Sequence, residues 1–275
     1  MASRDGAVTW TLDAGGSHAS SPCTDSPFMS SARLGQMARS AAPSTTVARL
    51  AQDLFDGRLH DPVAEEVSAW LAESRRFRAF VEVHRDKVRK KLRGATDAEA
   101  RRDVWAELRV AHLLLAERRI ELAFEAYGSG KGGPDFTVTF RGERRFNLEV
   151  TRPRGSPGAA SYGGPLLAKL RQLPPSAPNA VLVAIEGDSA AAFDVAGAIR
   201  ALRARADAKD DAFLTQRGFD GARGFYQRFT RLGAVLVLCD DAASDARASV
   251  WINGSARIAL PERALRACVA RLRAE

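Results

Sequence analysis

The sequence predicts an α/β fold in which a mixed β-sheet is flanked by helices. Between residue 47 and about residue 118, apolar residues recur at the three- and four-residue spacing of helices. Between residues 120 and 150 the spacing changes to the alternation of half-buried strands. Two continuous apolar runs then follow, at 181–185 and 234–239, and each has the length of a buried strand. Helices lie between these segments, so the sheet is expected to carry helices on its faces.

Four helices are expected before the first strand. The first begins near Val47 and the second near Pro62. The third is expected to run unbroken from Phe77 to a basic cluster that ends before Gly94. A Thr-x-x-Glu capping box, which starts at Thr96, is expected to open the fourth helix, and that helix should stop near residue 118.

Three strands should then form an antiparallel meander, with a break at 128–133 and a turn at Arg141-Gly142. A loop at 153–165 and a short helix at about 165–173 come next. The remaining expected elements are a strand at 181–185, a helix at about 190–208, a loop-rich region, a strand at 234–239, a hairpin turn at Asn253-Gly254 and a last helix from Pro261.

Length and composition are those of a globular protein. The chain has 275 residues, of which 45% are hydrophobic and 27% charged. Residues 1–44 are rich in Ser, Ala and Gly without a sustained period, so a flexible tail is expected there. Residues 45–95 are interpreted as a helical accessory region, and residues 96–275 as the α/β domain.

Charge and cysteine content narrow the class of partner. The 41 basic and 33 acidic residues give a net charge of +8, which is compatible with nucleic acid as a partner. Three widely separated cysteines offer neither a disulfide framework nor a zinc motif, so a reducing cytoplasm is expected. No apolar run is long enough for a membrane span, and no secretory signal is visible, so no membrane partner is expected.

Three acidic residues occupy positions that solubility alone does not explain. Glu107 shares a helix face with apolar residues, although it could also reach solvent at the edge of that face. Asp135 follows a Gly-Gly-Pro turn, where turn chemistry is an alternative role. Glu149 lies on the polar face of its strand. If the two strands pair around Gly142, Asp135 and Glu149 become neighbours, which requires a cation between them or a raised pKa.

This arrangement resembles the PD-(D/E)XK nuclease superfamily, whose members have the restriction-endonuclease-like fold. The resemblance covers residues 97–187 and rests on Glu107, Gly133-Pro134-Asp135 and Glu149-Val150-Thr151 in the order helix, three-strand meander, helix, strand. It implies that Asp135 and Glu149 bind Mg²⁺ or Mn²⁺, with Glu107 as an auxiliary ligand. Carboxylate oxygens also select these metals over zinc on chemical grounds.

One residue departs from the superfamily pattern. Thr151 stands where a lysine is expected, and threonine cannot supply the positive charge beside the reacting phosphate. Arg152 is adjacent but strand alternation turns it to the opposite face. Lys169, on the helix after the third strand, is the candidate replacement, with Gln172 close by on that helix; an ordinary solvated lysine is the alternative.

The leading hypothesis is a metal-dependent nuclease that cleaves DNA, with Glu107, Asp135, Glu149 and Lys169 as catalytic residues. The second is an inactive nuclease-like fold that binds nucleic acid or protein, and a homodimer is left open. Candidate nucleic-acid contacts are Lys87, Arg89, Lys90, Lys91, Lys131, Arg152 and Gln172. For the basic run from Lys87 to Arg93, a solvated helix end that complements the helix dipole is the alternative interpretation.

Overall fold

The structure is a computed structural model of the whole chain. It describes residues 45–127, 133–142, 144–154, 163–186, 194–241 and 244–273. The expected flexible tail at residues 1–44 lies outside the described residues, as does most of the glycine-rich break at 128–133.

The described part of the chain contains a six-stranded mixed sheet in the order β1-β2-β3-β4-β5-β6. The strands are β1 (Ile120–Phe124), β2 (Phe136–Phe140), β3 (Arg144–Thr151), β4 (Asn179–Glu186), β5 (Leu232–Asp241) and β6 (Ser244–Ile252). The first three form the antiparallel meander that the alternating pattern predicts. β4 is parallel to β3, β5 is parallel to β4, and β6 closes the sheet antiparallel to β5. The predicted α/β class with a mixed sheet is therefore confirmed.

From residue 45 onward, five helices precede the sheet: α1 (Thr45–Leu54), α2 (Pro62–Glu73), α3 (Arg75–Val83), α4 (Arg85–Gly94) and α5 (Ala98–Leu115). The expectation of one unbroken helix from Phe77 to the basic cluster is wrong, because the chain leaves helical geometry at His84. The break lets α3 and α4 each bury its own apolar side chains, such as Phe77 on α3 and Leu92 on α4. No proline or glycine marks it in the sequence.

The boundaries of α5 also differ from the expectation. Asp97, not Thr96, caps the helix, because its carboxylate accepts the N–H of Ala100 at 2.7 Å. The helix ends at Leu115, before the expected stop near residue 118, and the N–H of Ala116 turns back to the carbonyl of Leu113.

The second group of helices is α6 (Gly163–Leu170), α7 (Val195–Asp207), α8 (Asp211–Gln216), α9 (Gly221–Phe229) and α10 (Glu262–Leu272). The expected loop-rich region after α7 in fact contains α8 and α9. Gly218 and Gly221, both at positive φ, interrupt the helical pattern, yet Phe225 and Phe229 of α9 are buried.

The hairpin expected at Asn253-Gly254 is also wrong, because β6 pairs with β5 in the described residues and the chain then continues to α10. The Asn253 amide donates to the carbonyls of Phe229 and Leu232, and its oxygen accepts the N–H of Ser255. The asparagine therefore makes a local turn and fastens it to the end of α9.

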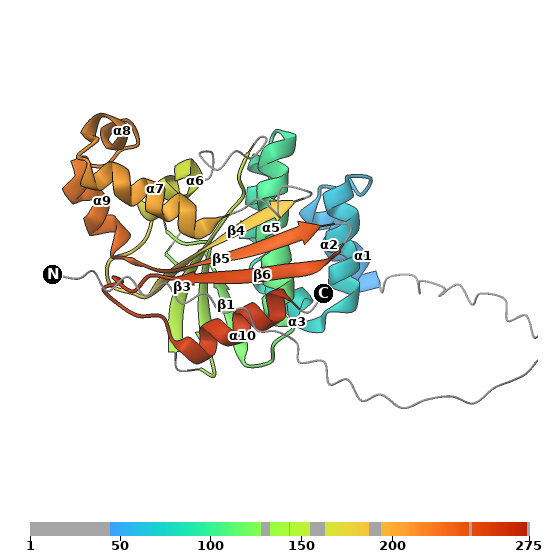
Figure 1. Cartoon of the computed structure of the whole chain (residues 1–275). Coiled ribbons are helices and arrows are strands. Elements are labelled where there is room, and N and C mark those ends of the chain that lie inside the picture. The colour runs from blue at the N-terminus through green and yellow to red at the C-terminus, as the bar shows by residue number, and fades with distance from the viewer. Residues whose placement is uncertain are drawn as a thin grey trace, which may run out of the picture.

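Two hydrophobic cores cover the two faces of the sheet. One core joins α1–α5 and α10 to the face that carries Leu148, Val150 and Leu182. The other joins α6–α9 to the face that carries Val181 and Val183. Figure 1 shows α7, α8 and α9 gathered together, away from α1, α2 and α3. The region at 45–95 thus packs into the same core as the sheet.

A search of the described helices for a membrane-spanning segment found none with sufficient length and apolar character.

Candidate functional site

Asp135 and Glu149 lie side by side at one end of the sheet. The pairing of Phe136 with Leu148 places them opposite each other, one residue beyond the last paired position of β2. The Asp135 N–H donates to Oε2 of Glu149 at 3.1 Å, and the Val150 N–H donates to Oδ2 of Asp135 at 2.8 Å. Both residues are buried. The backbone therefore fixes one oxygen of each carboxylate, and the structure brings these two predicted site residues together.

Glu107 joins them through a lysine. It is buried on α5, and its Oε2 accepts a hydrogen bond from Nζ of Lys91 at 2.5 Å. The same ammonium group donates to Oδ1 of Asp135 at 3.1 Å and lies 3.5 Å from Oε1 of Glu125. The free-energy cost of burying the Glu107 carboxylate on an apolar helix face is thus offset by the adjacent ammonium group of Lys91.

Lys169 reaches the site from α6, on the other side of the sheet. Its Nζ donates to Oε1 of Glu149 at 2.5 Å. This helix is held against β4 by the core that contains Leu166, Leu170 and Val181. The alternative of an ordinary solvated lysine is wrong, because the ammonium group is paired with a carboxylate that is only 2% exposed.

Burial and neighbouring charges shift the pKa values of the site residues. Burial, followed by the nearby Asp135 charge, raises the pKa of Glu107 well above its ordinary value. The same two causes raise the pKa of Glu149 to about 7. Burial opposes the charged form of Lys91, but the carboxylates of Glu107 and Asp135 outweigh it and raise the pKa of this lysine. Both carboxylates are therefore harder to ionise than in water, whereas Lys91 remains an ammonium ion.

The formal charges of the described residues can be counted. Four carboxylates, those of Glu107, Glu125, Asp135 and Glu149, lie near three ammonium groups, those of Lys87, Lys91 and Lys169. Four negative charges and three positive charges leave a balance of −1 when all are ionised. A bound cation would offset this negative charge.

The donor chemistry fits Mg²⁺ or Mn²⁺, since both prefer carboxylate oxygens. The present spacing does not yet assemble a ligand set: within the described ranges, no three His, Cys, Asp or Glu residues are grouped so that they could hold a metal ion. The carboxylate oxygens contact lysines instead. Lys91 stands between Glu107 and Asp135, and Lys169 takes the outer oxygen of Glu149.

Glu125 and Lys87 lie beside these carboxylates, and the sequence did not indicate either of them as a catalytic or metal-binding residue. Glu125 has a φ of 45°, which is uncommon for a residue with a side chain, and its N–H donates to the Asp135 carbonyl at 2.8 Å. Nζ of Lys87 donates to the carbonyls of Phe124 and Glu125, each at 3.0 Å. The four-residue spacing of Lys87 and Lys91 on one helix face was the signal available in the sequence.

A buried polar network lies behind Glu149 and was also missed. Asn147, two residues earlier on the same face of β3, donates from its amide to Oδ1 of Asn179 at 3.0 Å. Its own oxygen accepts the hydroxyl of Thr137 at 3.2 Å. The Tyr127 hydroxyl lies within hydrogen-bond distance of the Asn147 amide group. The alternation of Asn147 with Glu149 was visible in the sequence, but its partner Asn179 is 32 residues away.

The residues expected to contact nucleic acid fall into three groups. The first group binds within the protein and includes Lys87 and Lys91, whose contacts are given above. Arg89 belongs to it as well, since it pairs with Asp53 and Asp56. Arg152 does so as well, and it lies on the opposite face from Glu149 as expected, where it pairs with Glu99 and Asp103 of α5. Lys90 and Gln172 are exposed, and Lys131 lies outside the described residues.

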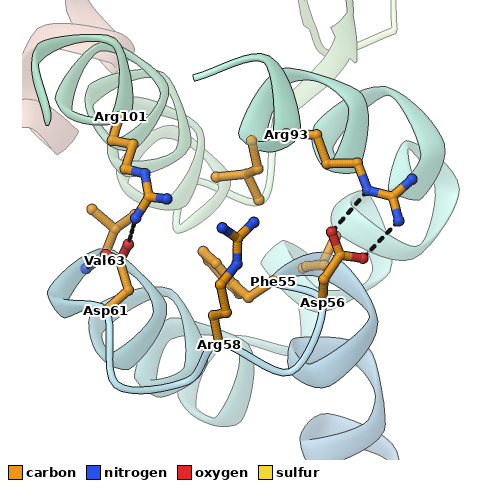
Figure 2. Close-up of a pocket in the computed structure, with 9 residues that line it drawn as sticks. Phe55, Asp56, Arg58, Asp61, Val63, Arg93 and Arg101 are labelled. Carbon is orange, nitrogen blue, oxygen red and sulfur yellow. Dashed lines mark hydrogen bonds and ion pairs between the residues drawn. The ribbon is translucent and has the colours of Figure 1, made fainter. Parts of the chain in front are cut away.

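A separate pocket opens among the N-terminal helices (Figure 2), and it contains none of the predicted catalytic residues. Arg93 of α4 forms hydrogen bonds to Asp56, and Arg101 of α5 pairs with Asp61, while the Arg58 guanidinium lies between these two pairs. Arg93 and then Arg89 hold the pKa of Asp56 well below its usual range. These pairs fasten the segment between α1 and α2 to α4 and α5.

Comparisons of the chain with protein-family models, with curated proteins and with solved structures found no match.

Proposed function

We propose that this protein is a Mg²⁺- or Mn²⁺-dependent nuclease that hydrolyses phosphodiester bonds in DNA, and that its fold is restriction-endonuclease-like. The observation that carries the proposal is the pair of buried carboxylates, Asp135 and Glu149, held side by side by the backbone of adjacent strands. The order of a helix, a three-strand meander, a helix and a parallel strand supports the proposed fold.

The carboxylates support a divalent cation. Burial, followed by the Asp135 charge, raises the pKa values of Glu107 and Glu149, so their ionised forms are disfavoured in the metal-free site and a bound cation would stabilise them. When bound, Mg²⁺ or Mn²⁺ supplies Lewis-acid stabilisation of phosphate charge and lowers the pKa of a water ligand. Asp135 and Glu149 would hold the ion, with Glu107 as an auxiliary ligand.

The remaining roles belong to the residues of the chain itself. Lys169 places a positive charge next to Glu149 and would stabilise negative charge on the phosphate. In the superfamily that this chain resembles, a lysine at the position of Thr151 supplies this charge. The backbone hydrogen bonds to Asp135 and Glu149 keep these carboxylates from rotating away. The net charge of +8 favours a polyanionic substrate. We also propose a cytoplasmic location, because three widely separated cysteines are typical of a protein in a reducing compartment.

A second candidate function is favoured by two specific observations. Thr151 stands at the position of the superfamily lysine, and the carboxylates already have ammonium partners. An inactive nuclease-like fold that binds nucleic acid or protein would have both features.

The test is cleavage of plasmid DNA by the purified full-length chain in Mg²⁺ or Mn²⁺. The nuclease proposal expects nicking that EDTA stops and that Glu149→Gln and Asp135→Asn abolish, while circular dichroism shows both variants folded. Glu82→Gln, at an exposed position on α3, is the matched control and should cleave normally. Absence of cleavage of DNA and RNA with either metal, together with salt-dependent binding in gel shifts, would contradict the nuclease proposal and support the binding module.

A further inference from the structure

Lys91 is the most extensively paired cation of the site. Its ammonium group lies 2.5 Å from Oε2 of Glu107, 3.1 Å from Oδ1 of Asp135 and 3.5 Å from Oε1 of Glu125. It also lies 5.0 Å from the centre of the Phe124 ring. Three carboxylates from α5, the end of β1 and the start of β2 therefore converge on one positive centre.

Lys91 contacts the oxygen of Asp135 that the backbone leaves available. Oδ2 of Asp135 accepts the Val150 N–H, so Oδ1 is the oxygen free to bind a cation, and Lys91 occupies it. Oε2 of Glu107 is likewise bound to Lys91. A metal ion bound to Oδ1 of Asp135 would need the oxygen that Lys91 occupies, and a metal ion shared with Glu107 would bind a carboxylate that Lys91 also contacts.

The helix that carries Lys91 is anchored independently of it. Lys87 binds the carbonyls of Phe124 and Glu125, and Arg93 binds Asp56. The Lys91 side chain itself is 24% exposed, so its flexible stem has a route to solvent. The ammonium group can therefore leave the carboxylates while α4 stays in place.

We propose that Lys91 is a built-in counter-ion that bridges Glu107 and Asp135 in the metal-free protein and competes with the divalent cation for their oxygens. This inference rests on the proposed metal site. It explains why the described residues bring the carboxylates into one neighbourhood without grouping three of them as ligands. Metal affinity is then set by the displacement of Lys91 as well as by the carboxylates.

The test measures metal affinity directly, without any activity assay. Free Mn²⁺ is followed by electron paramagnetic resonance during titration of the wild-type chain, Lys91→Met and Lys90→Met. Lys90→Met is the matched control, because it removes the same charge from an exposed position on the same helix. We expect Lys91→Met to bind Mn²⁺ at least about tenfold more tightly than the wild type, since a competing charge in contact with two ligands is gone. Lys90→Met should change the affinity by less than about twofold.

Removing Lys91 leaves a buried carboxylate without its cation, so Lys91→Met is also expected to be less stable than the wild type in EDTA. Circular dichroism establishes whether it folds. Should it not fold, Lys91→Gln, which keeps hydrogen-bonding capacity, takes its place, and the rise of its melting temperature on addition of Mn²⁺ should exceed that of the wild type.

The outcomes separate the two proposals. Equal or weaker Mn²⁺ binding by the Lys91 variants, when the wild type binds Mn²⁺ in a manner that Glu149→Gln abolishes, overturns the role of Lys91 and leaves the metal site standing. Absence of Mn²⁺ binding in all variants overturns both. Mn²⁺ binding that is tighter in the Lys91 variants than in the wild type and in Lys90→Met supports the counter-ion role.

Discussion

Replacement of Glu149 by glutamine removes an ionised carboxylate from a buried, negatively charged site. The side chain is 2% exposed and lies next to Asp135, whose N–H it accepts. Glutamine has nearly the same shape but only one side-chain oxygen, so it can accept from either the Asp135 N–H or Lys169, and its amide NH2 faces the other donor. Because the pKa of Glu149 is raised, the ionised carboxylate is disfavoured in the folded protein. We therefore expect Glu149→Gln to be more stable than the wild type in metal-free buffer, although Lys169 loses its charged partner.

The size of the effect follows from the raised pKa. Burial, followed by the Asp135 charge, moves the pKa of Glu149 from 4.5 to about 7. The native state then binds the proton more tightly than the unfolded state, so wild-type stability falls as the pH rises from 4.5 to 7 and levels off above that. At 1.36 kcal/mol per pKa unit, ionisation of Glu149 lowers the free energy of unfolding by about 3 kcal/mol in full. About 2 kcal/mol of this loss occurs between pH 5 and pH 8.5.

Urea denaturation of both proteins in EDTA, at pH 5 and at pH 8.5, measures the difference. The stability gain of Glu149→Gln should be larger at pH 8.5, and saturating Mn²⁺ should reduce the gain because only the wild type keeps the carboxylate. Glu82→Gln, at an exposed position, should show no such pH-dependent gain. A Glu149→Gln variant that is less stable than the wild type at pH 8.5 would refute the charge argument.

Two further predictions concern the scaffold. Arg141 has a φ of 54° in the β2–β3 turn, a conformation that asparagine tolerates better than arginine. Arg141→Asn should therefore raise the free energy of unfolding by about 0.5 kcal/mol in urea denaturation. A lower free energy of unfolding would show that the contact of Arg141 with the Phe140 ring outweighs the strain. Burial raises the pKa of Cys268 to about 12, so in a Cys23→Ser, Cys239→Ser background its thiol should react with Ellman's reagent only as fast as the protein unfolds, and prompt reaction would contradict this burial.

Local patterns predicted the meander and the approach of its carboxylates. Alternation from Phe136 to Phe140 and from Phe146 to Val150 set the buried face of both strands, and the turn at Arg141-Gly142 set their register. Once the register is fixed, the neighbourhood of Asp135 and Glu149 follows from geometry. Their catalytic role stays a prediction.

Lys169 was a candidate from the sequence, but the contacts of Lys91 could not be predicted in the same way. Lys91 is 16 residues from Glu107 and 44 from Asp135, and these contacts depend on how α4 packs against α5 and the end of β1. The break at His84, which has no proline or glycine, sets the direction of α4. Because tertiary packing decides that break, the basic run from Lys87 to Arg93 shows only that Lys87 and Lys91 share a helix face, and not that this face turns inward.

The position of the site shows how a lysine from another element can reach Glu149, as the proposed nuclease function requires in the absence of a lysine at residue 151. Glu149 and Thr151 point to the face of β3 that α6–α9 cover, and Lys169 of α6 reaches Glu149 on that face. Glu107 and Lys91 approach Asp135 from the helices that cover the opposite face. The carboxylates therefore meet at the end of the sheet, where both helical layers can supply a cation. A positive charge at the carboxylates can therefore come from either layer without a change in the sheet, and the proposed chemistry depends on that charge and not on a lysine at residue 151 alone.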